Sequence, residues 1–328
     1  MKLAAALGIV YIVWGSTYLA IAVADRTLPP FLMLSLRFLI AGALLYWWSA
    51  RRGEVAAEPP GRRQWRAAAI VGGLLLVVDT GGVAWAELRV SSGIAALIVA
   101  SVPLFMAVLD RAFFGVRLPF GGVVGLLVGL LGVGLLVGAS GHIDAAGIVV
   151  LLGASFAWAA GSTYARVAAL PQKPFLSAAM QMLCAGALLA LVGIGRGELG
   201  QVHLSEISSA SLAAVLFLIV FGSLVAFTAY GWLLKNASTR LLSTYAYVNP
   251  AVAVLLGWAL IGEKIGGREI AAGLVIVSSV GLLAFAREPR EQPEPTAESL
   301  PFHIRSQEAR TVEIRSAPRL SELYRVAA

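Results

Sequence analysis

Long apolar runs recur along this chain, each near the roughly 20 residues that cross the hydrocarbon core of a bilayer. They occupy residues 3–23, 31–50, 67–86, 91–110, 119–138, 146–165, 174–195, 210–233, 239–261 and 267–286. Hydrophobic residues make up 59% of the 328 and charged residues 13%, more apolar and less charged than a soluble domain. Because backbone groups in lipid must satisfy one another, these runs predict an all-α polytopic membrane protein with ten transmembrane helices.

The loops between the runs carry an uneven distribution of positive charge. With the N-terminus in the cytoplasm, 14 Lys and Arg fall on the cytoplasmic side and 5 on the other. This bias predicts that both termini are cytoplasmic. The positive residues behind the net charge of +7 lie mainly in the loops and not along one helix face. We therefore expect a lipid bilayer, and no nucleic acid, as a partner.

Short motifs repeat in order along the chain. Gly15–Tyr18 recurs as Gly161–Tyr164, Pro30–Leu32 as Pro174–Leu176, and Val133–Leu136 as Val280–Leu283. Each repeat holds five spans, and an odd number makes the second repeat enter the membrane from the opposite side. The sequence therefore predicts two inverted five-helix repeats, the plan of many secondary transporters.

The predicted domains are a first repeat over 1–140, a second over 141–286 and a C-terminal tail. Residues 287–328 hold seven Arg, seven Glu and five Pro, with few large apolar side chains. Such a segment buries too little apolar surface to offset its ordering entropy, so we expect a disordered cytoplasmic tail.

Several motifs resemble the EamA branch of the drug/metabolite transporter superfamily. They are Trp14–Tyr18, Arg37–Leu39, Trp85–Glu87, Ser92–Leu97, Pro103, Thr244–Pro250 and Gly262–Lys264. The resemblance covers residues 3–286 and implies ten helices, an inverted-repeat fold and export of small metabolites such as amino acids. The family's first repeat often carries Gly-Glu after the fourth span, whereas this chain has Gly115-Val116.

Two ionisable side chains, Arg37 and Asp79, fall well inside predicted spans, where charge is costly. At 1.5 Å per residue both lie roughly 10 Å below the same membrane face, a depth at which they can pair. One interpretation is a structural ion pair between the second and third spans, and the other is a gate or a proton-coupled carboxylate. Gln181 aligns with Arg37 in the second repeat, so the halves differ in charge at this position.

Aromatic and hydroxyl side chains supply the other predicted substrate contacts. The repeated motif suits close helix packing through its glycines, and equally a central cavity lined by its rings and hydroxyls. Other polar side chains come shortly before a proline in the fourth and ninth spans, where the proline can bend the helix. The predicted substrate-binding residues in and next to the repeated motif are Trp14, Ser16, Thr17, Tyr18, Trp158, Ser162 and Tyr164. Those that precede the prolines are Ser101, Tyr245 and Asn249.

The predicted function is a secondary transporter in a bacterial inner membrane, exporting small amphiphilic metabolites by alternating access. Multidrug or cationic-compound efflux is the alternative, followed by a membrane-embedded enzyme and a non-transporting assembly protein. We expect no enzymatic activity, cofactor or metal, because the sequence has no GxxxxGK[ST] motif, no aspartate-rich motif and no Ser/His/Asp set. A nearly neutral cavity of rings and hydroxyls suits zwitterionic or neutral substrates better than polyanions.

Overall fold

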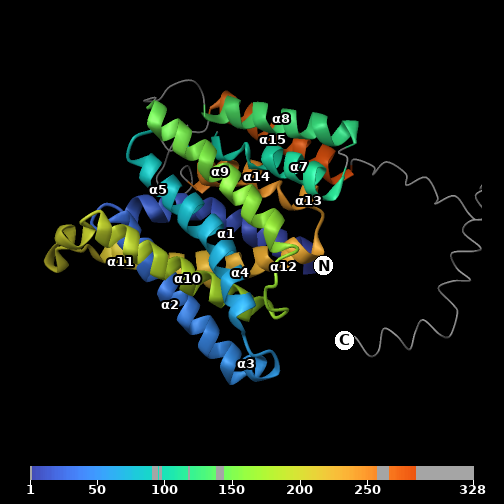
Figure 1. The fold of residues 1–328 in the computed structure, drawn as a ribbon. Helices are drawn as coiled ribbons and strands as arrows, with labels where there is room; N and C mark the ends of the chain where they lie inside the picture. Colours follow the sequence, from blue (N-terminus) through green and yellow to red (C-terminus); the bar gives the residue numbers. More distant parts are fainter. Residues whose placement is uncertain are drawn as a thin grey trace, which may run out of the picture. The chain divides into compact units, whose positions relative to one another are not determined.

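A computed structural model describes residues 2–90, 95, 98–116, 119–137, 144–256 and 266–285, all within one compact unit of the chain. Every regular element in these ranges is a helix (Figure 1). The predicted tail at 287–328 lies outside the described residues. The α-helices are α1 Lys2–Ala24, α2 Pro30–Arg51, α3 Glu54–Ala57, α4 Arg62–Gly72, α5 Gly81–Glu87, α7 Val102–Phe114, α8 Phe120–Val137, α9 Ala145–Ala165, α10 Pro174–Gly195, α11 Ser209–Phe217, α12 Thr228–Asn236, α13 Thr239–Leu242, α14 Tyr245–Leu256 and α15 Gly267–Phe285.

Two π-helical segments and two short 3-10 helices complete the described elements. The π segments are η1 Gly73–Thr80, between α4 and α5, and η4 Leu218–Phe227, between α11 and α12. The 3-10 helices η2 Glu198–Gln201 and η3 Leu204–Glu206 join α10 to α11. Each π segment continues its flanking helices, so Arg62–Glu87 and Ser209–Asn236 are two unbroken helical rods.

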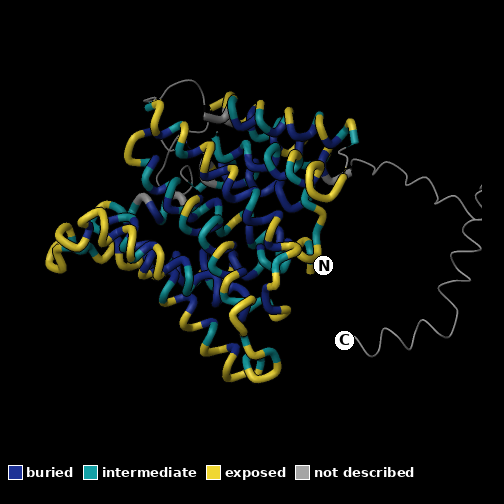
Figure 2. The backbone as a smooth tube through the Cα atoms, viewed as in Figure 1, coloured by how far each residue is buried: buried dark blue, intermediate teal, exposed yellow. Residues whose placement is uncertain are grey.

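Among the described residues, six helices are long and apolar enough to cross a membrane: Lys2–Ile21, Pro30–Arg51, Arg62–Glu87, Ala145–Ala165, Pro174–Gly195 and Ser209–Asn236. Apolar helices over Phe120–Leu135 and Ile270–Leu283 are shorter. Large apolar side chains such as Leu131, Leu191 and Val277 are more than 60% exposed. Figure 2 shows such exposed positions along the outer helices, with buried stretches between them. Exposed apolar surface on this scale fits helices that face lipid.

The predicted ninth span, 239–261, is interrupted. Its described part is α13 and α14, separated at Ser243 and Thr244. Both hydroxyls donate to carbonyls three residues earlier, Ser243 Oγ to Arg240 O at 3.1 Å and Thr244 Oγ1 to Leu241 O at 2.6 Å. Hydroxyls that bind nearby carbonyls compete with the helical ladder, which explains the break in an otherwise apolar run.

Local signals set the ends of α2 and α10. Both begin with proline, whose missing N–H costs nothing at the first helical position. Both are followed by a glycine with positive φ, 72° at Gly53 and 76° at Gly197, a conformation that other residues adopt only with strain. The Glu198 carboxylate accepts hydrogen bonds from the Phe31 and Leu32 N–H groups at 3.4 and 2.8 Å, so it caps the N-terminus of α2.

The same contact scheme occurs twice in the described helices. α1 packs against α14 and η4, and α9 packs in the same way against α7 and η1. α2 packs extensively on α10, and α8 on α15. At the α2–α10 crossing, a Cβ on Gly42 would lie 3.0 Å from Leu183, and a Cβ on Gly186 would lie 2.7 Å from Leu39. These glycines let the two helices approach closely.

Candidate functional site

A cavity of about 110 Å³ lies among α1, α2, η1, α9, η4 and α14. Segments far apart in the sequence meet around it, since α1 and α14 are neighbours, as are α9 and η1. Seven of the predicted site residues line the cavity. They are Trp14, Thr17, Arg37, Asp79, Trp158, Tyr245 and Asn249.

Arg37 enters the cavity from α2 and is 5% exposed. Its Nε donates to Ser223 Oγ of η4 at 2.8 Å. Gly222 leaves room for the guanidinium, because a Cβ at that position would lie 2.7 Å from Nη2. The side chain is therefore held by one hydrogen bond and by a close helix approach, and its remaining donors make no hydrogen bond to any described residue.

Asp79 reaches the same cavity from η1 and is 8% exposed. The predicted ion pair with Arg37 is absent, since no oxygen of Asp79 comes within 4.0 Å of an Arg37 nitrogen. The π segment supplies the physical reason, because an extra residue per turn rotates and displaces the side chains of this helix relative to an α-helix. No hydrogen bond to the Asp79 carboxylate is present among the described residues.

Four aromatic rings pack together beside these two charges. Trp14, Trp158, Tyr230 and Tyr245 have ring centroids 5.0 to 6.4 Å apart in all six pairings. Tyr230 is fully buried, and its hydroxyl lies 2.9 Å from Trp158 Nε1 and 2.6 Å from Ser162 Oγ. Aromatic rings in this arrangement give a rigid apolar wall with polar edges.

Similarity to known proteins identifies the family of this chain. The EamA-like transporter family model matches residues 2–138 and 145–285. The chain belongs to the EamA-like transporter family. It is 39% identical over 291 residues to "Uncharacterized inner membrane transporter YedA" of Escherichia coli (strain K12), covering 88% of this chain and 92% of that protein. A transporter family is not an enzyme class, and with six apolar helices the match supports a multi-pass protein of a bacterial inner membrane.

Two further relatives cover nearly the whole chain. "Probable amino-acid metabolite efflux pump" of Salmonella typhimurium is 23% identical over 291 residues, 84% of this chain and 93% of that protein. A solved structure described as "Crystal structure of protein" has a TM-score of 0.70 and 24% identity, covering 88% of this chain and 98% of that one. The structural match shows that the fold is shared.

Five further predicted site residues of this EamA-like transporter have described side chains that do not line the cavity: Ser16, Ser101, Ser162, Tyr164 and Gln181. Ser16 Oγ donates back to Val13 O at 2.7 Å, and Ser162 binds Tyr230 behind the aromatic rings. Gln181 Nε2 donates to Ser177 Oγ at 3.1 Å within α10. Tyr164 is 37% exposed and Ser101 Oγ is buried without a partner among the described residues. The side chain of Tyr18 lies outside the described residues.

Asn249 holds the ninth predicted span against the first. With its amide nitrogen directed toward them, it donates to Tyr245 O at 3.1 Å and to Tyr11 O at 3.2 Å. The Tyr11 hydroxyl in turn contacts Thr244 Oγ1. Asn249 therefore contributes both to the cavity wall and to the packing of α14 on α1.

Arg166 ties three helices together at one end of the bundle. Its Nη1 donates to Asp110 Oδ1 of α7 at 2.8 Å and to Thr239 Oγ1 of α13 at 2.9 Å. Its Cζ lies 5.0 Å from the Phe114 ring centroid. Asp110 is 5% exposed whereas Arg166 is exposed, so the carboxylate is buried and the guanidinium reaches water. The ion pair joins the ends of α7, α9 and α13.

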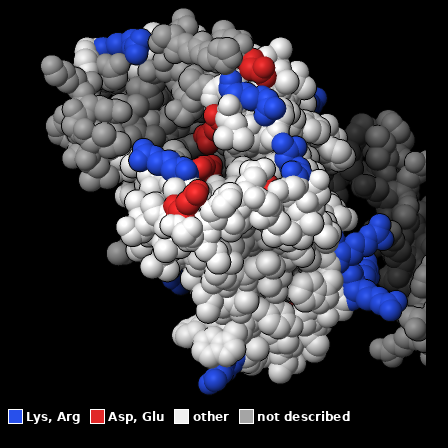
Figure 3. Space-filling view, turned by 90° about the vertical axis from the view of Figure 1, so that its left-hand side faces the viewer, with Lys and Arg blue, Asp and Glu red and all other residues white. Residues whose placement is uncertain are grey.

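Carboxylates gather at the end of the bundle where α1 meets α2. Burial, with the negative charge of Glu198, raises the pKa of Asp25 to about 7. Asp25 Oδ1 is buried without a hydrogen-bond partner in the described ranges. Figure 3 shows acidic side chains set in a hollow between basic ones on this side of the molecule. Asp25 is therefore a partly buried carboxyl just beyond the end of α1, where its ionised form is disfavoured.

Sequence reasoning missed Tyr230 and the Gly222-Ser223 pair that holds Arg37. One signal was available for Tyr230, since it is the only tyrosine in the predicted span 210–233. Gly222 and Ser223 interrupt a continuous run of large apolar residues in that span, which also marks them. Neither signal indicates which helix face turns inward.

Proposed function

We propose that this chain is a secondary transporter that exports small amphiphilic metabolites of the amino-acid class through the central cavity. The observation that carries the proposal is a guanidinium and a carboxylate, both almost fully buried, that line one cavity without pairing. Charge inside a membrane protein is costly unless it is compensated. A substrate bearing both an ammonium and a carboxylate would compensate both groups at once.

The aromatic rings complete the fit to an amphiphile. Trp14, Trp158 and Tyr245 line the cavity and would contact an apolar side chain, or an ammonium group through its attraction to the ring faces. The name of the Salmonella relative, "Probable amino-acid metabolite efflux pump", agrees with this class. Arg37 is assigned to the substrate carboxylate and Asp79 to the ammonium.

For the architecture we propose ten spans in two inverted repeats, with domains at 1–140 and 141–286 and both termini in the cytoplasm. The repeated contact scheme supports this proposal, as do π segments that occur in the third and the eighth predicted span. The Gly42–Leu183 and Leu39–Gly186 contacts relate the repeats by an offset of 144 residues, the same as that between Pro30–Leu32 and Pro174–Leu176. The charge bias of the loops supports the orientation.

Alternating access would then switch the cavity between the two membrane faces. The Arg166 contacts join α7, α9 and α13 at one end, and we assign them to the closed side of the present conformation. Pro250 within α14 and Pro103 at the start of α7 are the proposed hinges. A hinge role predicts that Pro250→Ala slows transport more than it weakens substrate binding.

Transport by purified protein in proteoliposomes tests the proposal. Vesicles loaded with one amino acid and exposed to the same labelled amino acid should accumulate label faster than empty vesicles, over a panel of twenty amino acids. Arg37→Gln and Asp79→Asn should each lower the rate at least ten-fold, whereas Tyr164→Phe, at an exposed position outside the cavity, should not change it. Full rates in both cavity variants would refute the assignment.

Efflux of cationic compounds is the second candidate, favoured by the unpaired Asp79 carboxylate beside aromatic rings. A cation needs Asp79 but not Arg37. Transport of tetraphenylphosphonium that survives Arg37→Gln and fails in Asp79→Asn would favour this alternative over amino acids.

A further inference from the structure

Five arginines meet where α2 ends and α4 begins, a region that we call the arginine corner. Its members are Arg51, Arg52, Arg62, Arg63 and Arg66, all exposed. Figure 1 shows α3 joining the end of α2 to the start of α4 at this corner. No lysine occurs between residues 51 and 66, so every positive group there is a planar guanidinium, the side chain best suited to bidentate contacts with phosphate.

The two acidic residues of the corner leave most of this charge uncompensated. Glu58 accepts hydrogen bonds from the Gln172 N–H at 3.1 and 3.0 Å. Glu54 Oε1 lies 3.9 Å from Arg52 Nε, at the outer limit of an ion pair. Three arginines, those of α4, have no ion pair with any described residue.

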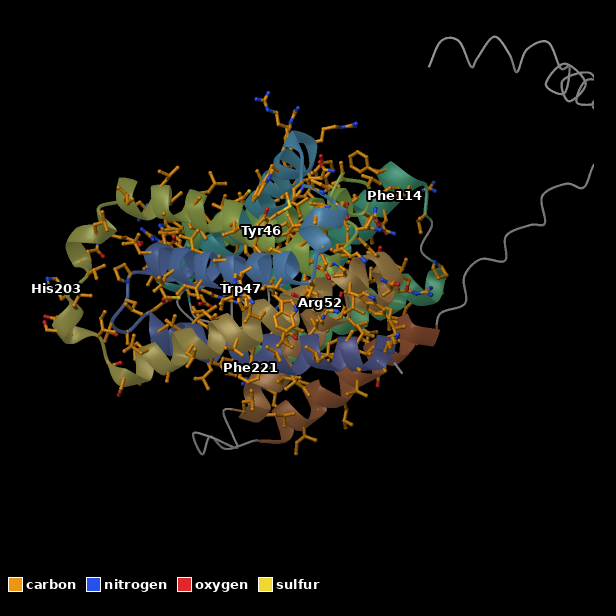
Figure 4. All side chains as sticks on the ribbon, turned by 90° about the horizontal axis from the view of Figure 1, so that it is seen from below. Tyr46, Trp47, Arg52, Phe114, His203 and Phe221 are labelled. Carbon is orange, nitrogen blue, oxygen red and sulfur yellow. The ribbon has the colours of Figure 1, made fainter. Side chains whose placement is uncertain are left out.

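Exposed tryptophans extend from the corner along α2. Trp47 is 54% exposed and Trp48 is 48% exposed. The Arg51 Cζ lies 4.9 Å from the Trp47 ring centroid, and the Arg52 Cζ lies 6.0 Å from that of Trp48. Figure 4 shows Trp47 and Arg52 close together at this end of α2. Tryptophan at the end of a membrane span lies at headgroup level, so the stacked guanidiniums are held at the depth of lipid phosphates.

We infer that the arginine corner binds the headgroup of an anionic phospholipid of the phosphatidylglycerol class. The phosphate contacts Arg51 and Arg52, the arginines of α4 add positive potential, and an acyl chain lies along Trp47 and the 47% exposed Leu44. Loop charge that only sets orientation requires neither stacking on tryptophan nor guanidinium groups. An acidic protein partner would not require exposed tryptophans within a membrane span, so lipid is the occupant to which the geometry points.

Lipid binding to the full-length protein in detergent tests this inference, because orientation in a membrane plays no part there. Native mass spectrometry with added dioleoyl-phosphatidylglycerol or dioleoyl-phosphatidylcholine gives the affinity for each lipid. We expect phosphatidylglycerol to bind at least five-fold more tightly. The R51Q/R52Q variant should lose that preference, and R62Q/R63Q should reduce it.

Arg111→Gln is the matched control, since Arg111 is also exposed near a helix end. Among the described residues its side chain makes one hydrogen bond, to the Gly115 carbonyl at 3.4 Å. It should keep the full preference. Equal affinity of the wild-type protein for the two lipids would overturn the inference. A preference that persists in both double variants would overturn it as well, as would displacement of phosphatidylglycerol by an acidic peptide at equal concentration. R62Q/R63Q and the wild-type comparison remain informative if R51Q/R52Q fails to fold.

Discussion

Gly72 offers the sharpest test of how the third and seventh predicted spans pack. A Cβ at this position would lie 2.4 Å from the carbonyl oxygen of Gln181 in α10, with the Gln181 C and Cα at 3.1 and 3.2 Å. The obstacle is backbone, so no side-chain rotation relieves it, and the helices must move apart by nearly 1 Å. α10 is also held by α2 at Gly42 and Gly186, which leaves it little freedom to move.

Overpacking of this kind costs about 1–3 kcal/mol, and the rigid backbone contact points to the upper end. Alanine recovers up to about 1 kcal/mol of helix propensity, so Gly72→Ala should destabilise the protein by about 2 kcal/mol. The entropy of unfolding grows with chain length, so for 328 residues this loss corresponds to a fall in Tm of about 3 °C. Thermal unfolding in detergent, followed by tryptophan fluorescence, measures the shift.

Gly153→Ala is the matched control, because a Cβ on Gly153 of α9 would meet nothing within 4 Å. Its Tm should stay the same or rise by about 1 °C through the gain in helix propensity. Equal Tm values for the two variants would refute the close approach of α4 to α10.

Two further predictions concern charged groups at opposite ends of the bundle. Arg166→Ala should destabilise the protein by about 2–3 kcal/mol, because it leaves the Asp110 side chain, 8% exposed, without its partner. In thermal unfolding, R166A/D110A should lose less stability than the sum of the two single variants. Additive losses would contradict the pairing. The pKa of Asp25 is raised to about 7, so folding favours its protonated form, and the stability of the wild-type protein should fall as pH rises from about 4 toward 8. Asp25→Asn cannot ionise and should therefore raise Tm more at pH 8 than at pH 5; the same gain at both pH values would show that Asp25 is not buried as described.

The helices themselves were largely predictable. The predicted spans 31–50, 146–165 and 174–195 differ by at most one residue at either end from α2, α9 and α10. These boundaries coincide with proline, or with a change from apolar to charged residues, so the physical signal is local. The third span was predicted to begin at residue 67, but its helix begins at Arg62, because arginine is a good helix former and needs no apolar environment.

The π segments could not be predicted. Apart from Asp79, Thr80 and Ser223, the sequences of η1 and η4 hold only apolar residues and glycine, so an extra residue per turn leaves little mark in the hydrophobic pattern. Counting residues along the predicted spans put Arg37 and Asp79 at the same depth in the membrane, and both line the cavity. Whether they pair depends on helix rotation, which the pattern does not record.

Helix geometry alone could have refined the repeated motif. At 100° per residue, Ser162 and Tyr164 point to nearly opposite sides of α9, so they cannot both face one cavity. In the structure Ser162 is fully buried and Tyr164 is exposed. Thr17 of the first copy of the motif lines the cavity, as does Trp158, which precedes the second copy by one turn of the helix.

The central claim, that Arg37 receives the carboxylate of a zwitterion and Asp79 its ammonium, is tested most directly by binding of three related ligands. Once an amino acid is found to bind, its amide lacks the carboxylate and its deaminated acid lacks the ammonium. Isothermal titration should show that the wild-type protein binds both analogues at least ten-fold more weakly than the parent. Arg37→Gln should lose discrimination against the amide alone, and Asp79→Asn should lose discrimination against the deaminated acid alone. Full discrimination retained in both variants would contradict the account.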